Sequence, residues 1–179
     1  IDRYILPAPP PSPNMEVVVE SGKVTIYWQD GAESFLDPIS QEADFEGYRI
    51  YGARKTANDD LGEFSLLLET DLKNNIGYNT GFSTIQITNQ FGEPDSMLIN
   101  NTYYHYKFDN ANIKDGWLNY YAVTAYDQGD PDANLESLES SIYSNRVYVF
   151  PGKAAANKND WIGEPTVYPN PFKGQALWD

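Results

Sequence analysis

The stretch Asn119-Tyr-Tyr-Ala-Val-Thr-Ala-Tyr-Asp127 decides the fold class of this chain. In an extended chain Tyr121, Val123 and Ala125 lie on one face, and the residues between them lie on the other. Both faces carry β-branched and aromatic side chains, which strands favour. The stretch is typical of a central strand of a β-sandwich, and it carries no catalytic signature.

Other runs on both sides of this stretch show the same extended pattern. Met15-Glu-Val-Val-Val-Glu20 and Lys23-Val-Thr-Ile-Tyr-Trp-Gln29 flank a Ser-Gly turn and predict a hairpin with Trp28 on its apolar face. The pattern of residues 64–69 fits either a strand or a short helix, although the length of the run favours a strand. The remaining strands are predicted over residues 45–51, 83–88, 97–99, 102–108 and 143–150. About eight strands separated by turns predict an all-β sandwich.

Composition narrows the possible function classes. The chain has 179 residues and is 41% hydrophobic, enough for one sizeable domain with flanking segments. It has 26 acidic against 12 basic side chains, a formal charge of -14, so we expect it to repel nucleic acids and anionic membrane surfaces. No apolar run approaches the ~20 residues that span a bilayer, so no membrane span is predicted.

Catalytic residue types are scarce. Cysteine is absent, which excludes disulfides, thiolate metal sites and cysteine nucleophiles. The single histidine, His105, is placed by strand alternation beside Lys107 on the outward face, so we expect a surface histidine. The sequence predicts no enzyme activity, although a glycosidase needs only a pair of carboxylates, and that alternative stays open.

Three segments together resemble a fibronectin type III module: Trp28, Gly47-Tyr-Arg-Ile-Tyr51 and Tyr121-Ala-Val-Thr-Ala-Tyr126. The resemblance covers about residues 11–151 and implies an immunoglobulin-like (fibronectin type III-like) sandwich. In that family an apolar residue and a tyrosine six positions later form the tyrosine corner. The matching positions here are Ile113 and Asn119, so the corner tyrosine is replaced. The chain is also longer than such a module, and the surplus at about residues 56–101 predicts an inserted hairpin.

The ends of the chain suggest its context. Residues 1–13 are predicted to be a proline-rich linker, 14–151 the sandwich, 152–166 a second linker and 167–179 the first strand of another domain. Val167-Tyr-Pro-Asn-Pro-Phe-Lys-Gly174 resembles the opening strand of the C-terminal sorting domains read by type IX secretion in the Bacteroidota and their relatives. This resemblance implies an internal or mature fragment of a larger extracellular or cell-surface protein. Its implied partners are other domains of the same polypeptide and the cell-surface or secretion machinery.

Two polar loops carry the candidate metal ligands. In a sandwich of this kind the loop after Trp28 and the loop after Asp127 emerge at the same end, so their acids are expected to converge. Residues 130, 132 and 134 repeat at the alternate spacing that opens many calcium loops. A solvated acidic end without metal remains the alternative. The predicted calcium ligands are Asp30, Asp37, Asp44, Asp127, Asp130, Asp132 and Asn134.

The functional hypothesis is a non-catalytic structural or interaction module of a secreted or cell-surface protein, exported through a C-terminal sorting signal. One alternative is an accessory carbohydrate-binding module of a secreted hydrolase, with a sugar-stacking platform of Tyr103, Tyr120, Tyr126 and Trp117. Another is a protomer of a surface filament. Asp95-Ser-Met97 also resembles the acceptor motif for O-glycosylation in the Bacteroidota, with Ser96 as the acceptor.

Overall fold

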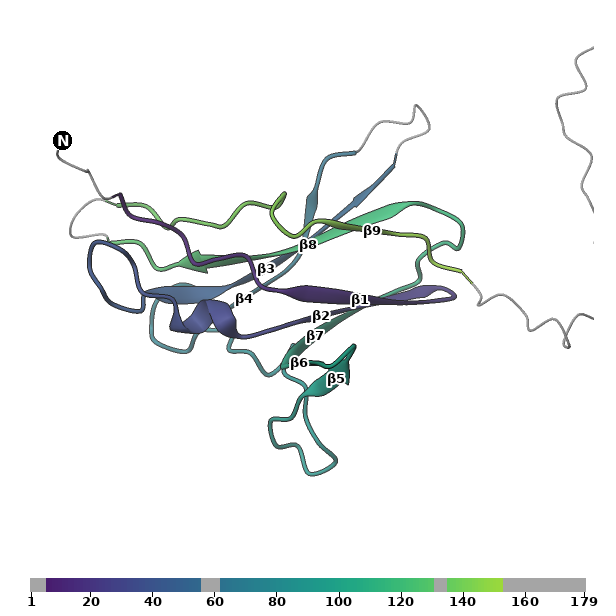
Figure 1. Ribbon diagram of the computed structural model, residues 1–179, viewed down its shortest axis with the longest axis horizontal. Helices are drawn as coiled ribbons and strands as arrows, with labels where there is room; N and C mark the ends of the chain where they lie inside the picture. Colours follow the sequence, from purple (N-terminus) through teal and green to yellow (C-terminus); the bar gives the residue numbers. More distant parts are fainter. Residues whose placement is uncertain (1–5, 56–61, 131–134, 153–179) are drawn as a thin grey trace, which may run out of the picture.

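Two antiparallel sheets pack face to face in the computed structural model, which describes residues 6–55, 62–130 and 135–152 (Figure 1). The first sheet has the order β1-β2-β7, formed by Met15–Glu20, Lys23–Trp28 and Tyr106–Ala111. The second has the order β4-β3-β8-β9, formed by Ser65–Asp71, Phe45–Arg54, Asn119–Asp127 and Val147–Val149. The predicted all-β sandwich is confirmed.

Two small elements complete the described fold. Strands β5 (Met97–Ile99) and β6 (Thr102–Tyr104) form a hairpin that projects from the sandwich (Figure 1). A single 3-10 turn, η1 (Gly31–Ser34), follows β2. Within the described ranges no helix is long and apolar enough to cross a membrane.

Strand β8 is the central strand that the sequence predicted. It pairs with β3 along its whole length and with β9 at its start. The predicted hairpin of β1 and β2 is also present, with Met15 opposite Trp28 and a turn at Gly22, whose φ of 75° suits glycine. The alternation of side chains along these strands therefore determines both which residues pair across strands and which face points inward.

The core lies between the two sheets and is rich in aromatic rings. Trp28 is fully buried, and its ring centroid lies 5.8 Å from that of Tyr48 and 5.8 Å from that of Tyr106. Tyr48 and Tyr106 also contact Phe82, at 5.6 Å each. Such ring pairs add to the free energy gained from burial alone. Trp28, Tyr121 and Val123, which lie on the predicted apolar faces, are buried here, as are Tyr48 and Ile50.

The outer face of the second sheet is covered as well. Glu139 lies over it and accepts hydrogen bonds from Thr124 Oγ1 (2.6 Å) and Tyr51 OH (2.9 Å), while its other oxygen pairs with Arg49 at 2.5 Å. The guanidinium of Arg49 stacks 4.1 Å from the ring centre of Tyr126. These interactions hold residues 137–140 against β8. Tyr126 is buried beneath Arg49.

The structure corrects three sequence predictions. Residues 83–88 form no strand, only isolated bridges such as that of Gln86 with Tyr106, because a turn interrupts the segment. The strand predicted over 143–150 shrinks to Val147–Val149, since turns occupy the preceding residues. The insertion predicted over 56–101 contains β4, which belongs to the main sheet, so within the described residues the added part begins after Asp71.

The position of the expected tyrosine corner keeps a local hydrogen bond. Ile113 and Asn119 are both buried, and Asn119 Nδ2 donates to the carbonyl of Trp117 at 2.8 Å. The hydroxyl of Tyr121 instead accepts from Asn110 Nδ2 at 3.0 Å. An asparagine thus supplies a side-chain to backbone bond where the family has a tyrosine.

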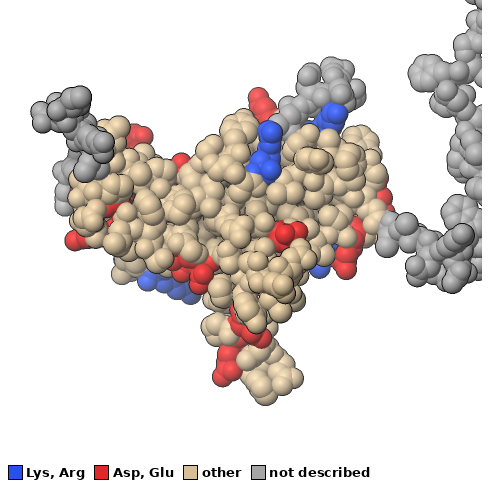
Figure 2. Space-filling model, viewed as in Figure 1, with Lys and Arg blue, Asp and Glu red and all other residues tan. Residues whose placement is uncertain are grey.

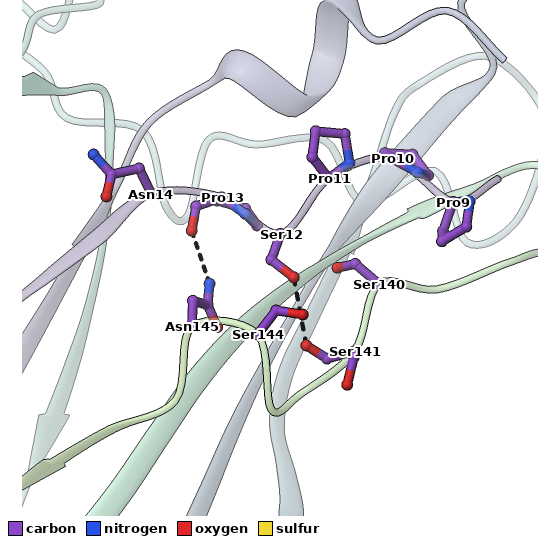
Figure 3. Close-up of a pocket in the computed structure, with 10 residues that line it drawn as sticks. All are labelled: Pro9, Pro10, Pro11, Ser12, Pro13, Asn14, Ser140, Ser141, Ser144 and Asn145. Atoms are coloured by element: carbon purple, nitrogen blue, oxygen red, sulfur yellow. Dashed lines mark hydrogen bonds between the residues drawn. The ribbon is translucent and has the colours of Figure 1, made fainter. Parts of the chain in front are cut away.

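The proline-rich segment expected as a linker lies against the sandwich. Figure 3 shows residues 9–13 beside Ser141 and Asn145. The two segments line a pocket of about 580 Å³. Asn145 Nδ2 donates to the carbonyl of Pro13 at 2.8 Å, and Ser12 Oγ donates to the carbonyl of Ser141 at 3.4 Å. Pro10 is fully buried. The segment therefore covers the residues that precede β9.

We expect Trp28→Ala to lower the free energy of unfolding by ~3–5 kcal/mol, because it empties a large volume in a packed core. Chemical denaturation followed by tyrosine fluorescence measures the change. Trp117→Ala is the matched control, since that indole is half exposed and its loss should be nearly neutral. Equal stability of the Trp28 variant and the parent would contradict the described core.

Candidate functional site

A groove of about 520 Å³ opens at the end of the sandwich where the two acidic loops meet. Figure 2 shows one face of the molecule, with acidic side chains on the sandwich and on the part of the chain that projects below it. Apolar side chains form part of the groove wall, namely Pro7, Ile39, Ile76, Leu135 and Leu138. The acidic side chains that line it are Asp37, Glu42, Asp44, Asp127, Asp130 and Glu136.

Asp37 is held by backbone amides. Its Oδ1 accepts from the N–H groups of Ile39 (2.7 Å) and Ser40 (2.9 Å), and its Oδ2 accepts from the N–H of Ala8 (3.2 Å). The hydrogen bond from Ser40 is the main reason that the pKa of Asp37 lies below its usual value. Asp37 thus stays ionised, and it ties the proline-rich segment to the loop after β2.

Asp127 closes the second loop. Its Oδ1 accepts from the N–H groups of Gly129 (3.0 Å) and Leu138 (2.7 Å), which joins the two sides of that loop. The side chain is only 4% exposed, and burial raises the pKa of Asp127 despite these bonds. The charge of Asp37 raises it further. The groove therefore contains a carboxylate, that of Asp127, whose ionised form is disfavoured by burial.

Asp44 has one buried carboxylate oxygen without a hydrogen-bond donor. Its Oδ1 is inaccessible to solvent and has no hydrogen-bond partner among the described residues. Burial raises the pKa of Asp44, and the charges of Asp127 and Asp37 raise it further, against a hydrogen bond from its own backbone N–H. The ionised form of Asp44 is therefore costly at this place in the fold.

The groove wall opposite these acids comes from the loop after β4. Asp71 accepts hydrogen bonds from the N–H groups of Tyr78, Asn79 (2.9 Å) and Thr80 (2.6 Å), so the loop folds around its carboxylate. Beside it Glu46 is 2% exposed, and burial raises its pKa. Together these bonds hold the loop that brings Ile76 to the groove.

The structure brings together only part of the predicted calcium set. Asp37, Asp44, Asp127 and Asp130 line one groove, as the loop argument predicted. Asp30 does not line it, and its carboxylate lies 3.2 Å from Nδ1 of His105 on the outer side of the first sheet. Asp132 and Asn134 lie outside the described residues. Among the residues that are described, no three acidic or histidine side chains converge to hold a metal ion, so calcium stays a prediction.

Sequence reasoning missed the apolar part of the groove. Ile39, Ile76 and Leu135 are 55%, 41% and 48% exposed, and each comes from a different loop. Apolar residues within these loops were the available signal, but only the fold shows that the three loops share one groove.

No known protein-family model matches this chain. No curated protein matches it either. The function of the groove must therefore be inferred from its own geometry and charge.

We expect Asp44→Asn to raise the melting temperature at pH 7. The pKa of Asp44 is raised by folding, so its contribution to stability is present below the unfolded pKa and is lost as pH rises through the folded pKa. Asparagine removes the charge that is penalised at neutral pH. The gain should shrink as pH falls towards 4, and thermal unfolding at both pH values measures it.

Asp37→Asn is the matched control and should behave in the opposite way. The pKa of Asp37 is lowered, so its stabilisation is present above the unfolded pKa and is lost as pH falls through the folded pKa. The substitution should therefore destabilise the protein at pH 7. A destabilised Asp44→Asn variant at that pH would show that the Asp44 carboxylate has a favourable partner.

Proposed function

We propose that this chain is a non-catalytic interaction module of a secreted or cell-surface protein, and that the groove between its loops is the surface that binds a partner. The observation that carries the proposal is the combination of exposed apolar residues with an acid, Asp44, whose buried Oδ1 has no hydrogen-bond partner among the described residues. Loops on a rigid sheet scaffold commonly carry binding residues. The groove lies on such loops.

The strand arrangement supports a fibronectin type III-like module. Among the residues that the structure describes, seven strands form the two facing sheets, three in one and four in the other, all antiparallel to their neighbours. Seven-stranded antiparallel sandwiches are characteristic of immunoglobulin-like domains. In this proposal the module acts beside other domains of the same polypeptide.

The roles of the charged groups support a binding module over an enzyme. Two carboxylates in the groove have raised pKa values, Asp44 and Asp127, which is also a feature of glycosidase sites. However, Asp127 is almost fully buried and its Oδ1 joins the two sides of a loop. Its carboxylate serves to shape the groove. His105 pairs with Asp30 away from the groove.

We further propose that residues 167–179 begin a sorting domain. Deleting residues 153–179 should leave cooperative unfolding nearly unchanged, because the described sandwich ends with the hydrogen bond from Gly116 N–H to the carbonyl of Pro151 (2.8 Å). In the native host the shortened protein should accumulate in the periplasm, which fractionation and surface labelling measure. Normal surface display would contradict the sorting proposal, and loss of cooperative unfolding would contradict the domain boundary.

A carbohydrate-binding role is the second candidate, and it rests on an aromatic surface that shares only Tyr120 with the predicted platform. The ring of Tyr120 lies 6.3 Å from that of Tyr148. The predicted platform is divided, since Tyr126 is buried and Tyr103 lies on the projecting hairpin. Tyr143 and Tyr148 are 70% and 67% exposed, and Arg146 stacks on the ring of Tyr143 at 5.4 Å. Exposed tyrosine rings suit stacking against sugars.

In this second candidate the protein should be retained on an insoluble polysaccharide, and Tyr143→Ala with Tyr148→Ala should abolish retention. Sedimentation of the protein with cellulose, chitin and xylan measures it. Tyr78→Ala with Phe91→Ala is the matched control, because both of these rings are 77% exposed and lie in other loops. Retention that survives loss of Tyr143 and Tyr148 would exclude this surface as the platform.

A further inference from the structure

We infer that the groove binds a lysine or arginine side chain that an apolar segment of a partner protein presents. This inference rests on the proposed function and specifies the partner chemistry of the same groove. It follows from three features of the groove: its charge, its apolar wall and its size.

The charge of the groove is one-sided. Six acidic residues line it, and its described lining includes no lysine, arginine or histidine. The buried Oδ1 of Asp44 lacks a hydrogen-bond partner, and the ionised form of this acid is disfavoured by its surroundings. A partner's ammonium or guanidinium group in the groove would supply a compensating charge for these acids.

The wall of the groove fits the rest of such a side chain. Lysine and arginine carry apolar stems, which pack along apolar surface while the charged head group reaches a polar site. Ile39, Ile76 and Leu135 provide exposed apolar surface beside the acids. Apolar neighbours in the partner segment would cover these three side chains, and burial of that surface would favour association.

The size of the groove favours an organic cation over a metal ion. Its volume of about 520 Å³ is in the range of sites for small molecules and peptide side chains. A calcium ion instead needs six to eight oxygen ligands at about 2.3–2.6 Å. The described acids do not converge in that way, and one of them, Asp127, already accepts two backbone N–H groups.

The test is selection of a displayed library of random heptapeptides on the immobilised full-length chain. We expect the selected peptides to contain lysine or arginine next to leucine, isoleucine, valine or phenylalanine. Fluorescence anisotropy with the labelled selected peptides then measures affinity for variants. Glu42→Gln with Asp44→Asn should weaken binding about tenfold, as expected when close charge pairs are lost. Ile39→Ser should weaken it through the lost apolar contact.

Glu16→Gln with Glu20→Gln is the matched control, because it removes the same charge from β1, whose residues do not line the groove. Binding should be unchanged in this variant. Equal weakening by both double variants would show attraction to net charge and overturn the inference. Displacement of the peptide by micromolar calcium, but not by magnesium, would also overturn it in favour of a metal site. Selected peptides that lack basic residues and bind the groove variant normally would overturn it while leaving an interaction role elsewhere on the module.

Discussion

The structure depends on one partly buried carboxylate, Glu33. The hydroxyl groups of Tyr48 and Tyr106 both donate to its Oε1, at 3.0 Å and 2.6 Å. Buried hydroxyls need partners, and these two tyrosines lie in the centre of the aromatic core. Burial raises the pKa of Glu33, and the two tyrosine hydroxyls oppose that rise. Because Glu33 lies on η1, the loop after β2 must fold back over the end of the core, and this path brings Asp37 and Asp44 to the groove.

Four of the acids near the groove form two pairs with opposite effects on stability. Asp37 and Asp71 each accept several hydrogen bonds, to Asp71 from the Thr80 hydroxyl as well as from backbone N–H groups, and these outweigh burial and lower the pKa of both. These two acids organise loops. Asp44 and Glu46 each have a buried oxygen without a described partner, and burial raises the pKa of both. Folding therefore leaves electrostatic strain at this end of the sandwich, the kind of local inconsistency that is expected at functional sites.

Much of the fold was predictable because alternation and turn residues carry local information. Strands β1, β2, β3 and β8 were predicted from their extended pattern, and Trp28, Tyr121 and Val123 are buried on the predicted inward faces. Residues 83–88 show that alternation alone does not establish a strand. Ile85 and Ile87 alternate and are both buried, yet the segment forms isolated bridges in place of a strand. Similarly, nothing local in the sequence indicates that Arg49 covers Tyr126.

The candidate site was less predictable, because it depends on contacts between distant loops. The sequence indicated that acids would converge at one end, but it could not separate Asp30, which pairs with His105, from the acids of the groove. The proline-rich segment adds a constraint that only the fold reveals. Prolines lack an N–H group and discourage pairing with a further strand. Residues 9–13 lie beside the segment before β9, at this edge of the second sheet. This edge is therefore poorly suited to pairing with a strand of another chain. Side chains on the loops, rather than backbone pairing at this edge, are therefore the more suitable means of recognition.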